Sequence, residues 1–268
     1  MAVVDTGIDS SHAEFRGRPI LGSNFGGDAR GIGYDSDGHG THVAGSVLGS
    51  GATSEPGSNH AGMAPEAHLY MQSLQCIDSN GDSGLYQPSD LQNDFFQPAY
   101  DFGARVHTNS WGYPPHGSNQ NYYDNEAYKI DQSAYSMDDM VILYAMGNDG
   151  RDVNSNGEVD LAYMNNQATA KNIISVGASE NFRPGLGGVW GTIGSPPLYP
   201  VTPISSDGTN DNQEGMAAFS NRGPTNDGRI KPDIVAPGTF IISTLSGDGE
   251  ATGTKCAVNN WAGGDDYC

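Results

Sequence analysis

The stretch from which the fold and chemistry of this chain can be predicted is Asp37-Gly38-His39-Gly40-Thr41-His42-Val43-Ala44-Gly45. His39 lies between two glycines, which let the backbone turn sharply and let another part of the chain approach the imidazole. The small residues that follow suit a helix packed tightly inside a protein. A histidine at the start of such a helix is well placed to transfer protons, because its ordinary pKa lies near neutrality. The alternative is a glycine-rich turn around a core histidine, because so short a motif is weak evidence by itself.

The chain is strongly acidic, with 12 Lys and Arg against 32 Asp and Glu and a formal net charge of −20. Nucleic acid and anionic membrane repel such a surface, so we expect neither as a general partner. The acidic excess fits cation binding, or solubility in salty or alkaline surroundings. No apolar run is long enough to span a membrane. At 268 residues and 36% hydrophobic content, the chain can bury one large core as a single domain.

Short apolar runs alternate with helix-like stretches along the chain. Residues 2–4 are apolar and β-branched, and they predict a buried strand that delivers Asp5 at its carboxyl end. Further strands are predicted at 67–72, 105–109, 140–145 and 173–176, and helices from His39, over 89–102 with Ser89 as N-cap and Gly103 as C-cap, and over 123–138. This alternation predicts an α/β fold with a doubly wound, mainly parallel central sheet flanked by helices.

Three cysteines, Cys76, Cys256 and Cys268, are too few for a disulfide framework. Cys256 and Cys268 could close a short loop and leave one thiol over. Alternatively, all three thiols are free. The sequence leaves both arrangements open.

Three polar residues stand where predicted strands or a helix begin or end, namely Asp5, His39 and Asn148. Together they suggest a base that is oriented by a carboxylate, with an amide donor for developing negative charge. Taken singly, Asp5 and Asn148 are also ordinary turn residues. The carboxyl edge of an open α/β sheet is where sites form, which favours the functional interpretation.

Five blocks of the sequence resemble, in order, the conserved blocks of the subtilisin-like serine peptidases. The similarity is greatest to the oxidatively stable alkaline enzymes of bacilli, and it runs through nearly the whole chain. It implies that Asp5 orients His39, that His39 is the general base, and that the Asn148 amide helps to form the oxyanion hole. The blocks are Val4–Asp9, His39–Gly45, Asn109–Gly112, Gly147–Gly150 and Pro232–Gly238.

The family's nucleophile lies in a Gly-Thr-Ser-Met-Ala block that should follow shortly after Pro237-Gly238, and residues 1–268 do not contain it. Other serines, such as Ser46, Ser110, Ser220 and Ser246, lack that context. We therefore expect residues 1–268 to be a catalytic domain truncated at both ends, with the serine a few residues past Cys268. Because a triad without its nucleophile keeps at most residual catalysis, this chain should be almost inert.

The resemblance also implies a substrate-binding surface. Ser110-Trp111-Gly112 matches the segment that pairs with an extended peptide substrate as an added strand. Gly84-Leu85-Tyr86 is placed to form the opposite rim, and Ala145-Met146-Gly147 would line the primary specificity pocket. Trp111 also has a plain alternative as a packing residue.

A polar loop suggests calcium. Asp152, Asn154, Asn156 and Asp160 place oxygen ligands at alternating positions around the turn-forming Gly157. The last position of an EF-hand loop would fall on Tyr163, so we expect a looser calcium site, with a solvated polar loop as the alternative. The loop Asp78–Gly84 is a weaker case of the same kind.

The combined prediction is a serine endopeptidase that hydrolyses peptide bonds through an acyl-enzyme, with protein or peptide substrates. The resemblance implies a secreted protein, although no signal peptide is visible, and we expect a monomer. The alternative is a catalytically inactive peptide-binding protein with the same fold, which the downstream sequence would distinguish. A calcium-dependent structural module would have no use for Asp5, His39 and Asn148 together.

Overall fold

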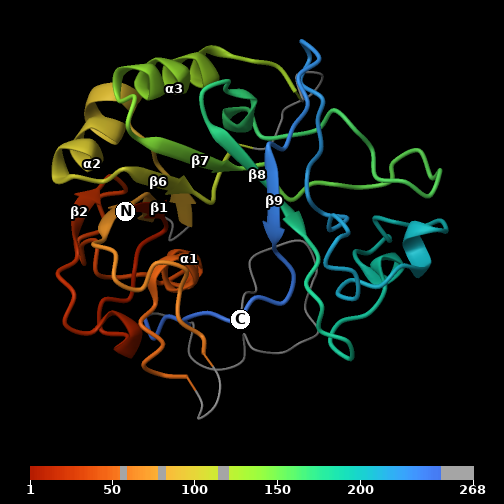
Figure 1. Ribbon diagram of the computed structural model, residues 1–268, viewed down its shortest axis with the longest axis horizontal. Helices are drawn as coiled ribbons and strands as arrows, with labels where there is room; N and C mark the ends of the chain where they lie inside the picture. Colours follow the sequence, from red (N-terminus) through yellow and green to blue (C-terminus); the bar gives the residue numbers. More distant parts are fainter. Residues whose placement is uncertain (55–58, 78–82, 114–120, 249–268) are drawn as a thin grey trace.

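The computed structural model describes residues 1–54, 59–77, 83–113 and 121–248, and in them a twisted parallel sheet forms the centre of the molecule (Figure 1). The strand order is β2-β3-β1-β6-β7-β8-β9, and every neighbouring pair is parallel, which confirms the predicted fold class. The strands are β1 (Ala2–Asp5), β2 (Leu21–Asn24), β3 (Tyr70–Ser73), β6 (Val106–Asn109), β7 (Val141–Ala145), β8 (Ile174–Ser179) and β9 (Ile234–Pro237).

Strand β1 lies inside the sheet, between β3 and β6, because it can be buried on both faces. Ala2, Val3 and Val4 have no exposed surface. Successive side chains of a strand point to opposite faces. Accordingly, Val3 packs in the cluster that contains Ala44 and Leu48 of α1 (His39–Leu48), whereas Val4 packs in the larger cluster on the other face.

Helices cover both faces of the sheet. In Figure 1, α1 lies on one side of the strands, and α2 (Gln97–Phe102) and α3 (Asn125–Ser136) lie on the other. The core on the α3 side combines Ala127 and Ile130 with Phe95 and Phe96. The shorter elements are the hairpin β4 (Gln75–Ile77) and β5 (Ser83–Leu85), the π-helix η2 (Leu91–Phe96), and the 3₁₀ turns η1 (Ala13–Phe15), η3 (Gln167–Thr169), η4 (Trp190–Thr192) and η5 (Ile204–Ser206).

The predicted helix over 89–102 is present with a different beginning. Its N-cap is Asp90, whose Oδ1 accepts a hydrogen bond from Asn93 N at 3.0 Å, and not Ser89. The first turns are π-helical, and the α-helical part begins only at Gln97. Pro98 has no N–H for an intrahelical bond, which favours the altered hydrogen-bond pattern before it. The end at Gly103, with φ of 103°, agrees with the predicted C-cap.

Among the described residues no helix is long and apolar enough to cross a bilayer. Cys76 is a free thiol, whereas Cys256 and Cys268 lie outside the described residues, as do positions 78–82 of the second polar loop.

A buried histidine connects the central strands. His107 on β6 has no exposed surface, and its Nε2 lies 2.9 Å from Oε1 of Gln72 on β3. Its Nδ1 lies 3.1 Å from Nδ2 of Asn109. Because an amide nitrogen only donates, Nδ1 accepts and Nε2 carries the proton, so the ring is neutral. Burial lowers the pKa of His107 to about 3.

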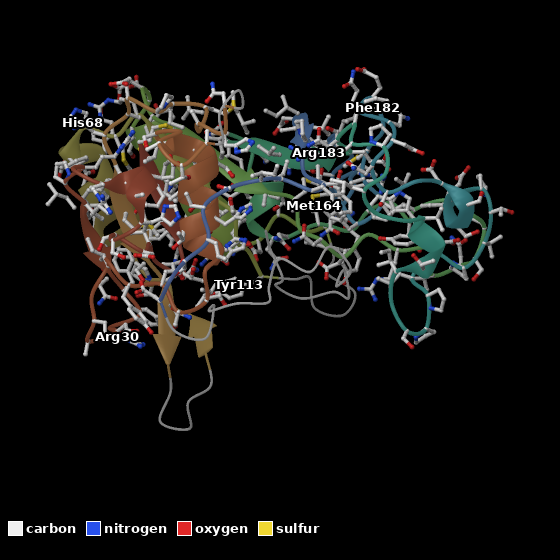
Figure 2. All side chains as sticks on the ribbon, turned by 90° about the horizontal axis from the view of Figure 1, so that it is seen from below. Arg30, His68, Tyr113, Met164, Phe182 and Arg183 are labelled. Carbon is white, nitrogen blue, oxygen red and sulfur yellow. The ribbon has the colours of Figure 1, made fainter. Side chains whose placement is uncertain are left out.

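We expect His107 to make folding acid-sensitive. Its folded pKa is lowered to about 3, so the unfolded state binds one more proton between that pH and the ordinary histidine value of about 6.5. The stability contribution is therefore present above about pH 6.5 and is lost as the pH falls. In urea titrations, His107→Gln should lower the slope of unfolding free energy against pH by up to about 1.4 kcal/mol per pH unit in this window. The exposed His68 provides the matched control, His68→Gln, whose slope should equal that of the wild type (Figure 2). Equal slopes for all three proteins would contradict the assignment.

Candidate active site

Asp5 and His39 meet at the carboxyl edge of the sheet. Asp5 is the last residue of β1, and His39 is the first residue of α1. Asp5 Oδ1 lies 2.5 Å from His39 Nδ1, with the carboxylate side chain 2% exposed and the imidazole 22% exposed. Thus the carboxylate is buried while the ring reaches the surface. The predicted orienting acid and general base are within hydrogen-bond distance.

A second buried carboxylate, Asp35, positions this pair, and the sequence analysis missed it. Asp35 Oδ1 accepts from Gly38 N at 2.9 Å and from Thr6 Oγ1 at 2.8 Å. Its Oδ2 accepts from Thr41 N at 2.8 Å and from Thr41 Oγ1 at 2.6 Å. One side chain thereby joins the end of β1 to the beginning of α1. The only signal in the sequence is an aspartate four residues before His39.

The predicted need for small residues in α1 is borne out by close contacts. A Cβ on Gly40 would lie 2.2 Å from Gly7 O, so a side chain there would push the helix away from the β1 turn. On the next turn, a Cβ on Gly45 would lie 2.3 Å from Thr244 Oγ1, and this hydroxyl donates to Thr41 O at 2.6 Å. The segment that carries Thr244 therefore packs directly onto the helix.

The electrostatic surroundings favour a protonated His39. Burial alone lowers the pKa of the imidazole, but the charge of Asp5 and its hydrogen bond oppose this effect, and Asp37 and Asp35 add to them. The result is a pKa raised to about 9. His39 is therefore a stronger base than an ordinary histidine, and it is largely protonated at neutral pH.

Asn148 follows β7 at the same edge of the sheet. Its side chain is exposed, and the preceding Gly147 has φ of 106°, a left-handed conformation that favours glycine. The buried Asn221 supports this turn, because it accepts from Asp149 N at 2.8 Å and donates to Met146 O at 3.1 Å. Asn221 is a second positioning residue, and no motif in the sequence predicted it.

The predicted substrate segments occupy different environments. Ser110-Trp111-Gly112 follows β6, which lies between β1 and β7. Trp111 is 7% exposed, and its ring packs edge-on against Phe95 and Tyr144 at centroid distances of 6.0 and 5.8 Å. Its side chain therefore packs in the core, as the alternative interpretation held.

The other two substrate segments differ in exposure. Gly84, Leu85 and Tyr86 are exposed at the end of the β4–β5 hairpin, as a rim requires. By contrast, Met146 is 1% exposed and packs with Met164 and Ala168 beneath the surface, whereas Ala145 and Gly147 are partly exposed. The assignment of these segments to substrate stays a prediction.

The four predicted calcium ligands form hydrogen bonds with one another or with the backbone of the loop. Asp152 accepts from Asn156 N and Gly157 N, both at 2.9 Å, through its two oxygens. Asp160 accepts from Val153 N and Asn154 Nδ2, both at 2.7 Å. Within the part of the chain that the structure describes, no three His, Cys, Asp or Glu side chains converge as around a metal. A cation would have to compete with these donors, so calcium binding by this loop stays a prediction.

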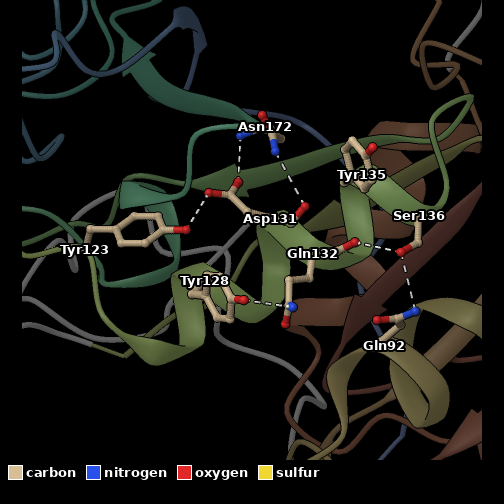
Figure 3. A pocket seen from close by; sticks show the side chains of 8 residues that line it. All are labelled: Gln92, Tyr123, Tyr128, Asp131, Gln132, Tyr135, Ser136 and Asn172. Atoms are coloured by element: carbon tan, nitrogen blue, oxygen red, sulfur yellow. Dashed lines mark hydrogen bonds between the residues drawn. The ribbon is translucent and has the colours of Figure 1, made fainter.

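A shallow pocket of about 360 Å³ lies against α3 and contains none of the predicted site residues (Figure 3). Asp131 at its centre is already satisfied by Tyr123 Oη at 2.8 Å and by the backbone N–H groups of Lys171 and Asn172. The pocket therefore offers hydroxyl and amide groups but no reactive pair. Its lining is Gln92, Tyr123, Tyr128, Asp131, Gln132, Tyr135, Ser136 and Asn172.

Comparisons with known proteins agree with this geometry. Residues 1–263 match the Subtilase family, Peptidase_S8. The chain is 30% identical over 314 residues to the serine protease/ABC transporter B family protein tagD of Dictyostelium discoideum, covering 96% of this chain and 16% of that protein. It is 30% identical over 255 residues to the serine protease AprX of Bacillus subtilis (strain 168), covering 92% of this chain and 47% of AprX. The chain thus spans about half or less of these relatives.

Among solved structures, the Clostridium perfringens CspB protease has a TM-score of 0.60 at 15% identity, over 92% of this chain and 76% of that one. A sequence identity this low to a solved structure shows only that the two chains share a fold. The match over residues 1–263 and the order of the Asp5, His39 and Asn148 blocks along a parallel sheet lead to one conclusion. The chain belongs to the subtilase family of serine peptidases.

Proposed function

We propose that the protein is a serine endopeptidase that cleaves proteins or peptides through an acyl-enzyme, with its nucleophilic serine downstream of residue 268. The observation that carries this proposal is the 2.5 Å contact between Asp5 Oδ1 and His39 Nδ1 in a subtilase chain. A buried carboxylate on one ring nitrogen fixes the tautomer that leaves the other nitrogen basic.

In the proposed reaction, His39 Nε2 takes the proton of the serine hydroxyl as the oxygen attacks the peptide carbonyl. Asp5 stabilises the imidazolium, and the Asn148 amide donates to the oxyanion. The imidazolium then protonates the leaving amine, which departs from an acyl-enzyme. Water, deprotonated by His39, attacks the ester and releases the acid, and the proton returns to serine.

The substrate is proposed to lie extended along Ser110-Trp111-Gly112, with its backbone paired as an added strand. The exposed Gly84-Leu85-Tyr86 faces it from the other side, and Ala145-Met146-Gly147 surrounds the side chain next to the cleaved bond. We propose secretion and a monomeric state from the family resemblance. The alternative is a catalytically inactive peptide-binding protein with the same fold, which the sequence downstream of residue 268 would distinguish.

The triad can be tested in the full-length protein with its downstream serine. His39→Ala should abolish casein hydrolysis, and Asn148→Ala should lower kcat by roughly a hundredfold or more, because it removes an oxyanion donor. Circular dichroism would check that both variants fold. Near-normal activity of folded His39→Ala would refute the mechanism.

The pH dependence of the reaction follows from His39. The pKa of the ring is raised to about 9, and only the neutral ring can accept a proton. We therefore expect kcat/KM to rise about tenfold per pH unit up to a plateau above about pH 9. Asp37→Asn removes one of the charges that raise this pKa, so the midpoint should move to lower pH. As a control, Glu214→Gln removes an equal negative charge at an exposed position and should leave the midpoint of the pH profile unchanged. A midpoint near 6.5 in the wild type would contradict this description of the site.

Calcium binding by residues 152–160 can be separated from a purely structural role of Asp152. If calcium binds only the folded state, saturation at a hundred times its dissociation constant stabilises it by about 2.7 kcal/mol. EDTA should then lower the Tm of the inactive His39→Ala protein, and Asp152→Ala should remove this difference. A merely structural Asp152, which caps Asn156 and Gly157, would lower the Tm equally in calcium and in EDTA. Identical melting of the parent protein in both solutions would exclude the calcium site.

A further inference from the structure

The pocket beside α3 lies outside the site of the proposed reaction (Figure 3). Its volume of about 360 Å³ falls within the range of roughly 300–1,000 Å³ that is usual for small-molecule sites. One wall is a face of α3 on which Tyr128, Gln132 and Tyr135 recur at helical spacing. The neighbouring face of the same helix, with Ala127 and Ile130, packs in the core. The side that faces the pocket is therefore available to a ligand.

The lining of the pocket carries almost no charge, although the chain has 12 basic and 32 acidic side chains. Among the described residues that line it, Asp131 is the one carboxylate, and none is a lysine, arginine or histidine. Asp131 is 7% exposed, and both of its oxygens already accept hydrogen bonds, from Tyr123 Oη and from backbone N–H groups. Since no group in the lining is left to neutralise a charged molecule, the pocket suits a neutral ligand.

The floor of the pocket is fixed before any ligand arrives. Asp131 joins α3 to the segment that enters β8, because it accepts from Lys171 N at 2.8 Å. It also holds Tyr123, whose ring is covered by Lys171 Nζ at 4.5 Å from its centroid. Burial and the bond to Asp131 raise the pKa of Tyr123, so its hydroxyl keeps the proton that it donates. A ligand therefore does not have to order this part of the site.

Two exposed tyrosine rings supply the apolar part of the site. Tyr135 is 83% exposed and Tyr128 is 49% exposed. Gln132 Nε2 donates to Tyr128 Oη at 3.0 Å, which restrains that ring. The face of an aromatic ring is electron-rich and attracts positively polarised C–H groups. One face of a pyranose ring presents such C–H groups, so the two rings are suitable platforms for a sugar.

Side-chain amides supply the polar part of the site. Within the part of the chain that the structure describes, the side-chain oxygens of Gln92, Gln132 and Asn172 accept no hydrogen bond. Each amide offers an acceptor beside a donor. Neighbouring hydroxyls of a sugar match this pattern, because every hydroxyl both donates and accepts.

The same acceptors argue against the other common ligand of tyrosine-lined grooves, a proline-rich peptide. Proline has no N–H group, so a polyproline segment offers carbonyl acceptors and no main-chain donors. It would leave the three amide oxygens without partners. A hydroxyl-rich ligand satisfies them.

We propose that this pocket binds a neutral pyranose unit of an oligosaccharide, with the rings of Tyr128 and Tyr135 stacked on the sugar and the side-chain amides bonded to its hydroxyls. The inference goes beyond the proposed function and does not depend on it. In Figure 1, α3 lies on the other side of the strands from α1, which carries His39. A bound saccharide would therefore leave the Asp5–His39 pair accessible.

The binding test uses the full-length His39→Ala protein, which cannot digest itself by the proposed mechanism, and calorimetry with maltohexaose, cellohexaose, mannohexaose and chitohexaose. We expect at least one of them to bind with a Kd on the order of 1 mM or lower. Tyr135→Ala should weaken this binding at least about tenfold, because it removes a stacking platform. Tyr135 is 83% exposed, so the substitution should leave the Tm unchanged. Tyr135→Phe keeps the ring and should keep the binding.

The matched control is Phe182→Ala, which removes a 58% exposed ring outside the pocket and should bind as the parent does (Figure 2). A proline decamer serves as the rival ligand. The inference is overturned if no hexasaccharide binds, if only the proline decamer binds, or if binding survives Tyr135→Ala. Equal losses in Tyr135→Ala and Phe182→Ala, or a loss in Tyr135→Phe, would also overturn it.

The outcome is separable from that of the proposed function. Saccharide binding by a full-length protein that cleaves no peptide would support the pocket and refute only the peptidase. Peptide cleavage by a protein that binds none of the hexasaccharides would refute only the pocket.

Discussion

The structure depends on one buried carboxylate, Asp35, which lies between the central strand and the helix that carries the base. It has no exposed surface, and its two oxygens accept four hydrogen bonds from Thr6, Gly38 and Thr41. Thr6 is the residue after Asp5, so the same carboxylate sets the positions of both partners of the Asp5–His39 contact. Bonds to an ionised acceptor are among the stronger ones in proteins, which suits a group that must hold two elements in register.

The sheet provides the frame on which this contact forms. Because all neighbouring strands are parallel, β1, β6 and β7 end at one edge and deliver Asp5, the 110–112 segment and Asn148 there. Within the sheet, the neutral His107 bridges Gln72 and Asn109, so both of its ring nitrogens are paired. The two histidines of the central region therefore have opposite pKa shifts. Burial dominates at His107, and neighbouring carboxylates dominate at His39.

Much of this arrangement could be predicted from local sequence. The run Ala2-Val3-Val4 has no polar face and predicts a buried strand, and the alternation of such runs with helices predicts a parallel sheet. Small residues after His39 predict a closely packed helix, and contacts at Gly40 and Gly45 agree. The order of Asp5, His39 and Asn148 along the chain is sufficient to identify the family, because each of these residues lies in a sequence block with a characteristic spacing of residues.

What the sequence by itself determined is therefore the fold class, the family and the residues at the carboxyl edge, since these follow from periodicity and local motifs. The tertiary structure alone decided which distant groups support them. Asn221 reaches the turn at Gly147 from 74 positions away in the chain, and Gln87 and Gln167 meet on Glu126 from opposite directions. It also decided that Trp111 packs in the core and that Asp152 caps its own loop. Such contacts depend on the path of the whole chain, and no local pattern encodes them.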